Sequence, residues 1–177
     1  MGELNIVPEC YVDTKIAEIL GQAKGKYNHQ HSNGAVSNEL QRRFNERVVI
    51  GIVDEDKGKG SAPKYFSEFN IVAEENNLIL KKHKDRNQYL ILVCPEMEKW
   101  LLSDAEKVNI EPSSEEYNLP NRLNGLIKIS KIKDIDKNAG FKKFIKALVR
   151  EKAPSITTLK TWIELFQTDQ LNSLNKK

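Results

Sequence analysis

The chain has 177 residues, and 39% of them are hydrophobic, which is enough to build one sizeable core. Its 28 basic and 25 acidic residues leave a net charge of +3, too small to predict nucleic-acid binding from charge alone. No apolar run is long enough to cross a bilayer, and the first residues lack the pattern of a signal peptide. The two cysteines, Cys10 and Cys94, do not suggest a disulfide scaffold. We therefore expect a single cytoplasmic domain that makes no contact with a membrane.

The first part of the chain alternates between strand-like and helical patterns. Residues 4–7 form a short apolar run that Pro8 ends, and residues 11–20 carry apolar side chains at helical spacing. A polar loop then leads to a helical pattern at 36–44, with Ser37 as its candidate cap. A strand at 47–53 follows. This order predicts an α/β fold with a mostly parallel, Rossmann-like sheet flanked by helices.

The remaining elements complete this α/β core and add a helical end. Strands are predicted at 78–82 and 88–94, either as a hairpin or as two neighbouring strands, and helices at 96–108, 141–151 and 156–166, the last capped by Ser155. Residues 65–71 fit no single pattern, 112–120 read as a loop, and 168–177 read as frayed. We expect residues 1–110 to form the α/β core and 111–177 a helical extension packed on it, within one domain.

The segment 48–56, VVIGIVDED, reads as a strand buried on both faces that ends in carboxylates. Asp54 and Asp56 are two residues apart, so in an extended chain they leave the backbone on the same side, with Glu55 on the other. Two such acids repel each other unless a cation lies between them, and oxygen ligands favour a hard ion such as Mg²⁺. The alternative is a solvated acidic turn beside Lys57 and Lys59.

Acidic residues follow three apolar runs of the chain. They are Glu9 and Asp13 after the first run, Asp54 and Asp56 after the second, and Glu96 and Glu98 after the third. If the first two strands are parallel neighbours joined through helices, their carboxyl ends lie at one edge of the sheet and the acids converge, which favours a metal site. Alternatively, Glu96 lies in the first turn of the following helix, where the helix dipole favours an acid without any function.

The segments VPECYVD, VIGIVDEDKG and CPEMEKWLL, which span about residues 3–108, together resemble the TOPRIM fold. They are most similar to the branch of small bacterial TOPRIM-like proteins and the OLD-family nucleases of phage defence. In that family a strand ends in Glu with an Asp four residues later, matched by Glu9 and Asp13. A second strand ends in DxD, matched by Asp54 and Asp56, and Glu98 matches an acid that precedes a Trp-Leu-Leu helix. The chain departs from the family at Cys10, which stands where the family has Gly, and at Pro8, which precedes the Glu.

The resemblance implies a Mg²⁺- or Mn²⁺-dependent nuclease that acts in a bacterial defence or repair system. It assigns catalysis to Glu9, Asp54 and Asp56 and metal binding to these three with Glu98, while Asp13 and Glu96 support the site. Lys57 and Lys59 either meet a phosphate or are ordinary loop lysines. The sequence has no GxxxxGK[ST] motif, so an ATPase partner of the OLD type must be a separate chain.

Basic residues gather in the carboxy-terminal third of the chain. Those predicted to contact nucleic acid are Lys142, Lys143, Lys146 and Arg150, and the alternative is that they form the solvated face of a helix. His29 and His31 are either metal ligands, a general base, or solvated loop residues. Two other functions stay open: a noncatalytic TOPRIM-like module that binds nucleic acid or an ATPase, and an enzyme acting on a nucleotide or another phosphate ester.

Overall fold

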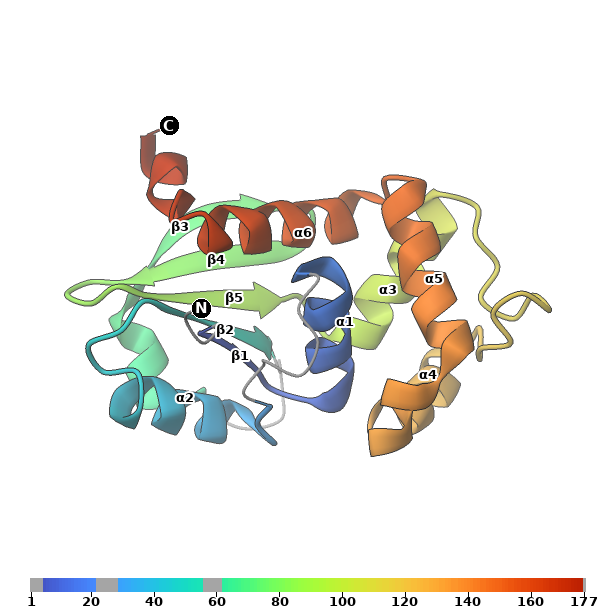
Figure 1. Cartoon of the computed structure of the whole chain (residues 1–177), viewed down its shortest axis with the longest axis horizontal. Coiled ribbons are helices and arrows are strands. Elements are labelled where there is room, and N and C mark those ends of the chain that lie inside the picture. Colours follow the sequence, from blue (N-terminus) through green and yellow to red (C-terminus); the bar gives the residue numbers. More distant parts are fainter. Residues whose placement is uncertain (1–4, 22–28, 56–61, 177) are drawn as a thin grey trace.

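The computed structural model of the chain describes residues 5–21, 29–55 and 62–176, and it is built around a five-stranded sheet (Figure 1). The strands, in chain order, are β1 (Ile6–Pro8), β2 (Val49–Asp54), β3 (Phe69–Glu75), β4 (Leu78–His83) and β5 (Gln88–Val93). Their order across the sheet is β1-β2-β5-β4-β3. The α/β class and the flanking helices agree with the sequence prediction.

The sheet is mixed, so the prediction of a mostly parallel sheet was wrong for its second half. β1, β2 and β5 run parallel, whereas β4 pairs antiparallel with both β5 and β3. The reason is the length of the connections, because only a longer crossover can join parallel neighbours. Asn76 and Asn77 alone join β3 to β4, and both have positive φ angles, 49° and 59°, as a tight hairpin turn of this kind requires.

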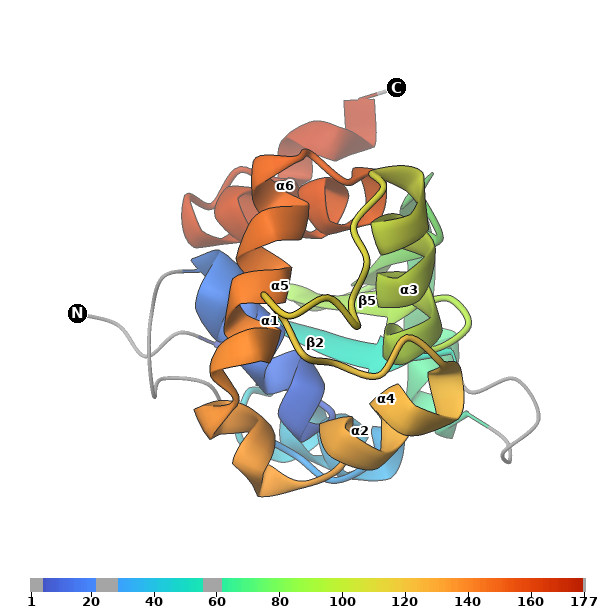
Figure 2. The ribbon, with the colours of Figure 1, turned by 90° about the vertical axis from the view of Figure 1, so that its right-hand side faces the viewer.

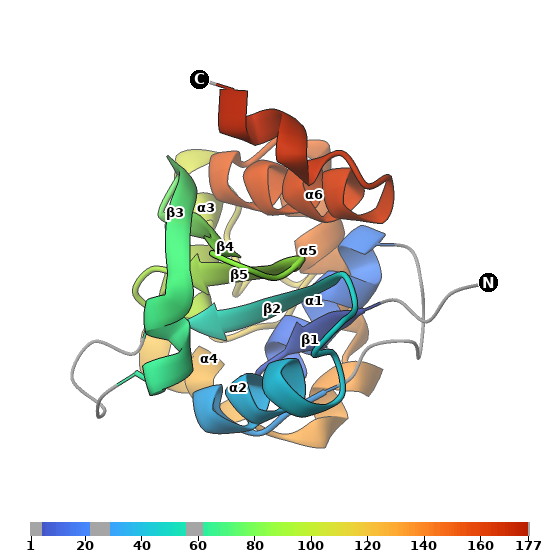
Figure 3. The same cartoon turned by 90° about the vertical axis from the view of Figure 1, so that its left-hand side faces the viewer.

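Helices cover both faces of the sheet and its carboxyl end. The helices are α1 (Tyr11–Gly21), α2 (Asn33–Arg42), α3 (Met97–Lys107), α4 (Leu123–Ser130), α5 (Ala139–Arg150) and α6 (Pro154–Gln167), with short 3-10 helices η1 (Lys64–Glu68), η2 (Lys133–Lys137) and η3 (Leu171–Lys176). Figure 3 shows α6 on one side of the sheet and α2 on the other. α3, α4 and α5 lie beyond the ends of β2 and β5 and stand in front of the sheet in Figure 2.

The central strand β2 is buried on both faces, as its unbroken apolar pattern predicted. Ile50 and Ile52 belong to the larger core with α1 and α6, whereas Val49 and Val53 belong to the smaller core under α2. Gly51 sits where α2 comes closest, since a Cβ there would lie 3.1 Å from both Val36 and Leu90 side-chain carbons. Successive side chains of a strand point to opposite faces, so Asp54 points to the same side of the sheet as Ile50 and Ile52, the side that α1 covers.

Two predicted helix caps were wrong because the helices begin earlier than their apolar patterns. α2 is capped by Ser32, whose Oγ accepts a hydrogen bond from the Ala35 backbone N–H at 3.1 Å, while Ser37 is buried within the helix. α6 begins at Pro154, so Ser155 lies inside it rather than before it. Pro is well suited to the first helical position because its missing N–H would have no partner there.

The carboxy-terminal end of the chain is part of the core. Residues 168–177 were predicted to be frayed, but Leu171 in η3 is only 2% exposed and packs in the same cluster as Trp162 and Ile163 of α6. Trp100 and Trp162 are both buried, and Cys10 and Cys94 are free cysteines. The sequence patterns also gave no indication of α4.

No helix in the described part of the chain is both long enough and apolar enough to span a membrane.

Asp104 of α3 fixes the beginning of α6. It is fully buried, and its carboxylate accepts hydrogen bonds from the backbone N–H groups of Ser155 and Ile156, at 3.2 and 2.8 Å, and from the Ser155 hydroxyl at 2.7 Å. Ala153, at the N-cap position, has no side chain that could do this. Asp104 thus supplies from another helix the capping oxygen that α6 lacks.

We expect Asp104→Ala to lower the free energy of unfolding by about 3 kcal/mol, because it leaves buried donors without an acceptor. Urea unfolding followed by circular dichroism measures the change. Asp134→Ala is the matched control, because the Asp134 side chain is 78% exposed and its ion pair with Lys137 is long, at 3.9 Å. Equal stability of the two variants would contradict the capping role.

Candidate acidic site

The ends of β1 and β2 bring Glu9 and Asp54 together. In the parallel pair, Pro8 lies opposite Ile52, and the Glu9 backbone N–H donates to the Ile52 carbonyl at 2.9 Å. The Glu9 side chain then turns across to β2, where its Oε2 accepts a hydrogen bond from the Asp54 backbone N–H at 3.1 Å. The meeting of these two acids, expected from adjacent strand ends, is thus present in the fold.

Asp13 adds a third carboxyl group from the first turn of α1. Its Oδ2 accepts a hydrogen bond from the Cys10 backbone N–H at 3.1 Å, which closes the turn between β1 and the helix. The side chain is only 1% exposed, and its Oδ1 has no hydrogen-bond partner among the described residues. An unpartnered buried carboxylate oxygen is costly, so it marks a place where a proton or a cation would be held.

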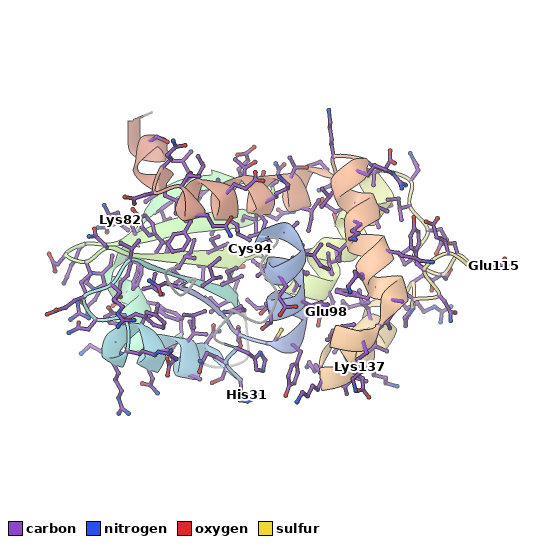
Figure 4. The ribbon with its side chains drawn as sticks, in the orientation of Figure 1. His31, Lys82, Cys94, Glu98, Glu115 and Lys137 are labelled. Atoms are coloured by element: carbon purple, nitrogen blue, oxygen red, sulfur yellow. The ribbon has the colours of Figure 1, made fainter. Side chains whose placement is uncertain are left out.

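Glu98 of α3 is the fourth carboxyl group. α3 begins against β2, because the Met97 backbone N–H donates to Asp54 Oδ1 at 2.9 Å. Glu98 is 5% exposed and accepts a hydrogen bond from the hydroxyl of Ser130, the last residue of α4. Figure 4 shows Glu98 beside α1, in the interior of the molecule. Sequence reasoning did not find Ser130, because α4 was not predicted.

The pKa values of two of these carboxyl groups, Asp54 and Asp13, are raised. Burial is the main cause for Asp54, and the nearby acids Asp13, Glu98 and Glu9 add to it, so that its pKa rises to about 9. The pKa of Asp13 rises to about 8, again mainly through burial, with Glu9 and Glu98 adding to the shift. At neutral pH both groups therefore hold protons. Among the described residues, the charges that raise these two pKa values are those of the neighbouring acids, which disfavour a further negative charge.

The thiol of Cys10 shares these surroundings. Burial raises its pKa well above the usual range, and the charges of Asp13 and Asp54 raise it further. The thiol therefore stays protonated. Since only a thiolate is an effective nucleophile, Cys10 is not a candidate catalytic nucleophile.

A cavity of about 540 Å³ opens onto the cluster. Its walls include the acids Glu9, Asp54, Glu98 and Glu96, and also Lys131, which follows α4. Glu96 stands at the N-cap position of α3, where its side chain makes no capping hydrogen bond, and it lines the cavity. The acids therefore form one wall of a space that a small group could enter.

The other predicted site residues are either not described or lie elsewhere on the structure. Asp56, Lys57 and Lys59 lie outside the described residues. Lys143, Lys146 and Arg150 are exposed on α5 and Lys142 is half-buried, and among the described residues the basic side chain that lines the cavity is Lys131 instead. Within residues 5–21, 29–55 and 62–176, no three His, Cys, Asp or Glu side chains are arranged so that they could hold a metal ion.

No family model, curated protein or solved structure matches the chain.

Proposed function

We propose that the protein is a Mg²⁺- or Mn²⁺-dependent nuclease that cleaves phosphodiester bonds of nucleic acid, as the TOPRIM resemblance implies. The observation that carries the proposal is the meeting of four carboxyl groups, from β1, α1, β2 and α3, in one largely buried cluster. Burying acids together is unfavourable, and strongly perturbed acids in a cleft are typical of functional sites. A structural role alone would not require this arrangement.

The donor atoms of the cluster suit a hard divalent ion. All four groups offer oxygen, and one oxygen of each is held by a protein donor: Glu9 by Asp54 N–H, Asp13 by Cys10 N–H, Asp54 by Met97 N–H and Glu98 by Ser130 Oγ. Metal-binding carboxylates are commonly oriented in this way by a second layer of hydrogen bonds. Asp13 Oδ1, buried and without a hydrogen-bond partner, is an oxygen that a cation would satisfy. Glu9, Asp54 and Glu98, supported by Asp13 and the predicted Asp56, would hold the ion, and because no three of the described carboxyl groups are already placed to coordinate one ion, binding would draw them together.

The role that we propose for each residue follows from its position. A bound Mg²⁺ or Mn²⁺ would neutralise the charge on the phosphate and on the leaving oxygen. Glu9 is half-buried on the cavity wall, where it can hold or transfer a proton as a general acid or base. Asp13 holds the turn that aims Glu9, through its bond to Cys10 N–H. Lys131 can meet a phosphate at the other side of the cavity as a point charge.

A cleavage assay tests the proposal. Plasmid DNA and single-stranded DNA and RNA are incubated with the purified chain in Mg²⁺, in Mn²⁺ and in EDTA, beside a panel of nucleotides and simple phosphate esters. We expect cleavage of polymeric substrates that depends on the metal. Hydrolysis of small esters alone would instead support the alternative that the protein acts on a nucleotide or another phosphate ester. Absence of both activities, with no heat of Mg²⁺ binding by calorimetry, would contradict the enzyme proposal.

A second candidate is a noncatalytic module, and it rests on α5. This helix buries Phe141, Phe144 and Leu148 and turns Lys143 and Lys146 to solvent, so it offers a basic face to nucleic acid or to a separate ATPase chain. Copurification with an ATPase that Lys143→Glu and Lys146→Glu disrupt, together with no metal binding, would favour this candidate. Action in a bacterial defence or repair system is part of both proposals.

A further inference from the structure

Three aromatic side chains form a cluster on the wall of the acidic cavity. The Tyr11 and His29 rings are stacked, with centroids 4.2 Å apart and planes at 18°. His31 meets them edge-on, with its centroid 4.7 Å from that of His29 and 6.1 Å from that of Tyr11. All three line the same cavity of about 540 Å³ as Glu9, Asp54 and Glu98. Aromatic rings and the acids thus share one space.

The cluster is held against the strand end that carries Glu9. Tyr11 is the first residue of α1, two positions after Glu9. The Gln30 backbone N–H donates to the Pro8 carbonyl at 3.0 Å, which fixes the segment with both histidines beside β1. Thr14 Oγ1 lies within hydrogen-bond distance of His29 Nδ1, at 3.0 Å, and sets the orientation of that ring. The rings are therefore positioned by the same backbone as the acids.

The other walls of the cavity carry apolar and positively charged groups. Ile127 of α4 and Lys131, which is exposed, line it together with the rings. Lys128 and Lys133, on either side of Lys131 in the chain, are exposed as well. In Figure 4, His31 and Lys137 both lie at the lower edge of the molecule, near the lower end of α1. Flat rings beside a cationic edge are the groups that proteins use to bind single-stranded nucleic acid, through base stacking and phosphate contacts.

We propose that the cluster of Tyr11, His29 and His31 receives an unpaired nucleobase, so that the substrate is single-stranded nucleic acid or an unpaired end. This inference rests on the proposed nuclease function and names its substrate class. In a duplex each base face is covered by its neighbours, and only an unpaired base can stack on a protein ring. A base on these rings would place its backbone in the cavity between Lys131 and the acids.

The test measures binding without divalent metal, so that it does not depend on cleavage. The full chain is titrated in EDTA with a fluorescent 12-nucleotide strand that contains 2-aminopurine, and with the same strand in a duplex. We expect the single strand to bind at least about tenfold more tightly and its 2-aminopurine fluorescence to be quenched by stacking. His31→Ala, at an exposed position, should remove most of this preference and the quenching, whereas His31→Phe, which keeps a flat ring, should retain both.

Two further variants separate stacking from charge. Lys131→Ala should weaken binding of single strand and duplex alike and reduce the dependence on salt, as the loss of a phosphate contact does. Lys84→Ala is the matched control and should change nothing, because Lys84 follows β4 at the opposite end of the sheet from the acids. Equal affinity for single strand and duplex, or equal binding by the wild type and His31→Ala, would overturn the inference. Single-strand binding without cleavage would leave the inference standing and contradict the nuclease proposal alone.

Discussion

Asp54→Asn is expected to lower metal-dependent cleavage by more than about 100-fold. This substitution keeps the shape of the side chain and the acceptor for Met97 N–H, but an amide cannot lose a proton to become the negatively charged ligand that a bound metal ion would require. Changes to groups that merely orient metal ligands already cost 10- to about 100-fold, so the loss of a ligand should cost at least as much. Initial rates of oligonucleotide cleavage in Mg²⁺ and Mn²⁺ measure the effect.

The same substitution should make the metal-free protein more stable at alkaline pH. Burial and the neighbouring acids raise the pKa of Asp54, so ionising it near pH 9 within the fold is unfavourable, and a neutral amide avoids that cost. Thermal unfolding in EDTA at pH 8.5 should therefore show a higher Tm for Asp54→Asn than for the wild type. A change that lowers activity while raising stability is characteristic of a functional site.

Glu55→Gln is the matched control. It neutralises the carboxylate of the next residue, whose side chain points to the other side of an extended backbone. We expect this variant to retain cleavage and to show the wild-type dependence of Tm on pH. If Asp54→Asn cleaves as fast as Glu55→Gln, Asp54 is not part of the catalytic site. If Asp54→Asn is also the less stable of the two at pH 8.5, the cluster is a structural feature.

The parts of the site that lie on regular elements could be predicted from the sequence. The unbroken apolar pattern of β2 indicated a strand covered on both faces, and parallel neighbours necessarily place their carboxyl ends at one edge. Glu9 and Asp54 meet for that reason alone. Asp13 follows from helical geometry, because an acid in the first turn of α1 can reach back to the Cys10 backbone.

The parts that depend on tertiary contacts could not be predicted. Ser130 reaches Glu98 across 32 positions of the chain, and Asp104 caps α6 across 51, so no local pattern indicates either contact. α4 has few turns, and its apolar residues also suit other structures. The antiparallel pair of β4 and β5 is the hairpin that the sequence allowed as one of two arrangements, whereas β3 fitted no single pattern, and its pairing with β4 depends on the turn at Asn76 and Asn77.

The pH dependence of stability should weaken when metal is added. In the metal-free protein the pKa values of Asp13 and Asp54, about 8 and about 9, lie above the value of roughly 3.9 for an unfolded Asp. Between these limits the folded chain binds more protons than the unfolded chain. Stability rises with pH only where the unfolded state binds more protons, so here these two groups make the free energy of unfolding fall as pH rises from about 6 to 9.

Saturating Mg²⁺ should oppose this fall, because an ion can replace the protons that the cluster otherwise holds, and its affinity therefore increases with pH. At 100 times the Kd, binding to the folded state alone adds about 2.7 kcal/mol to the free energy of unfolding. Urea unfolding at pH 6, 7.5 and 9, in EDTA and in Mg²⁺, should give two curves that separate as pH rises. If the curves in EDTA and in Mg²⁺ run parallel, the ion does not bind where the protons are held. That result would contradict the proposal that the acidic cluster is the metal site. Asp13→Asn and Asp54→Asn should each reduce the separation, because each removes one of the two titrating groups.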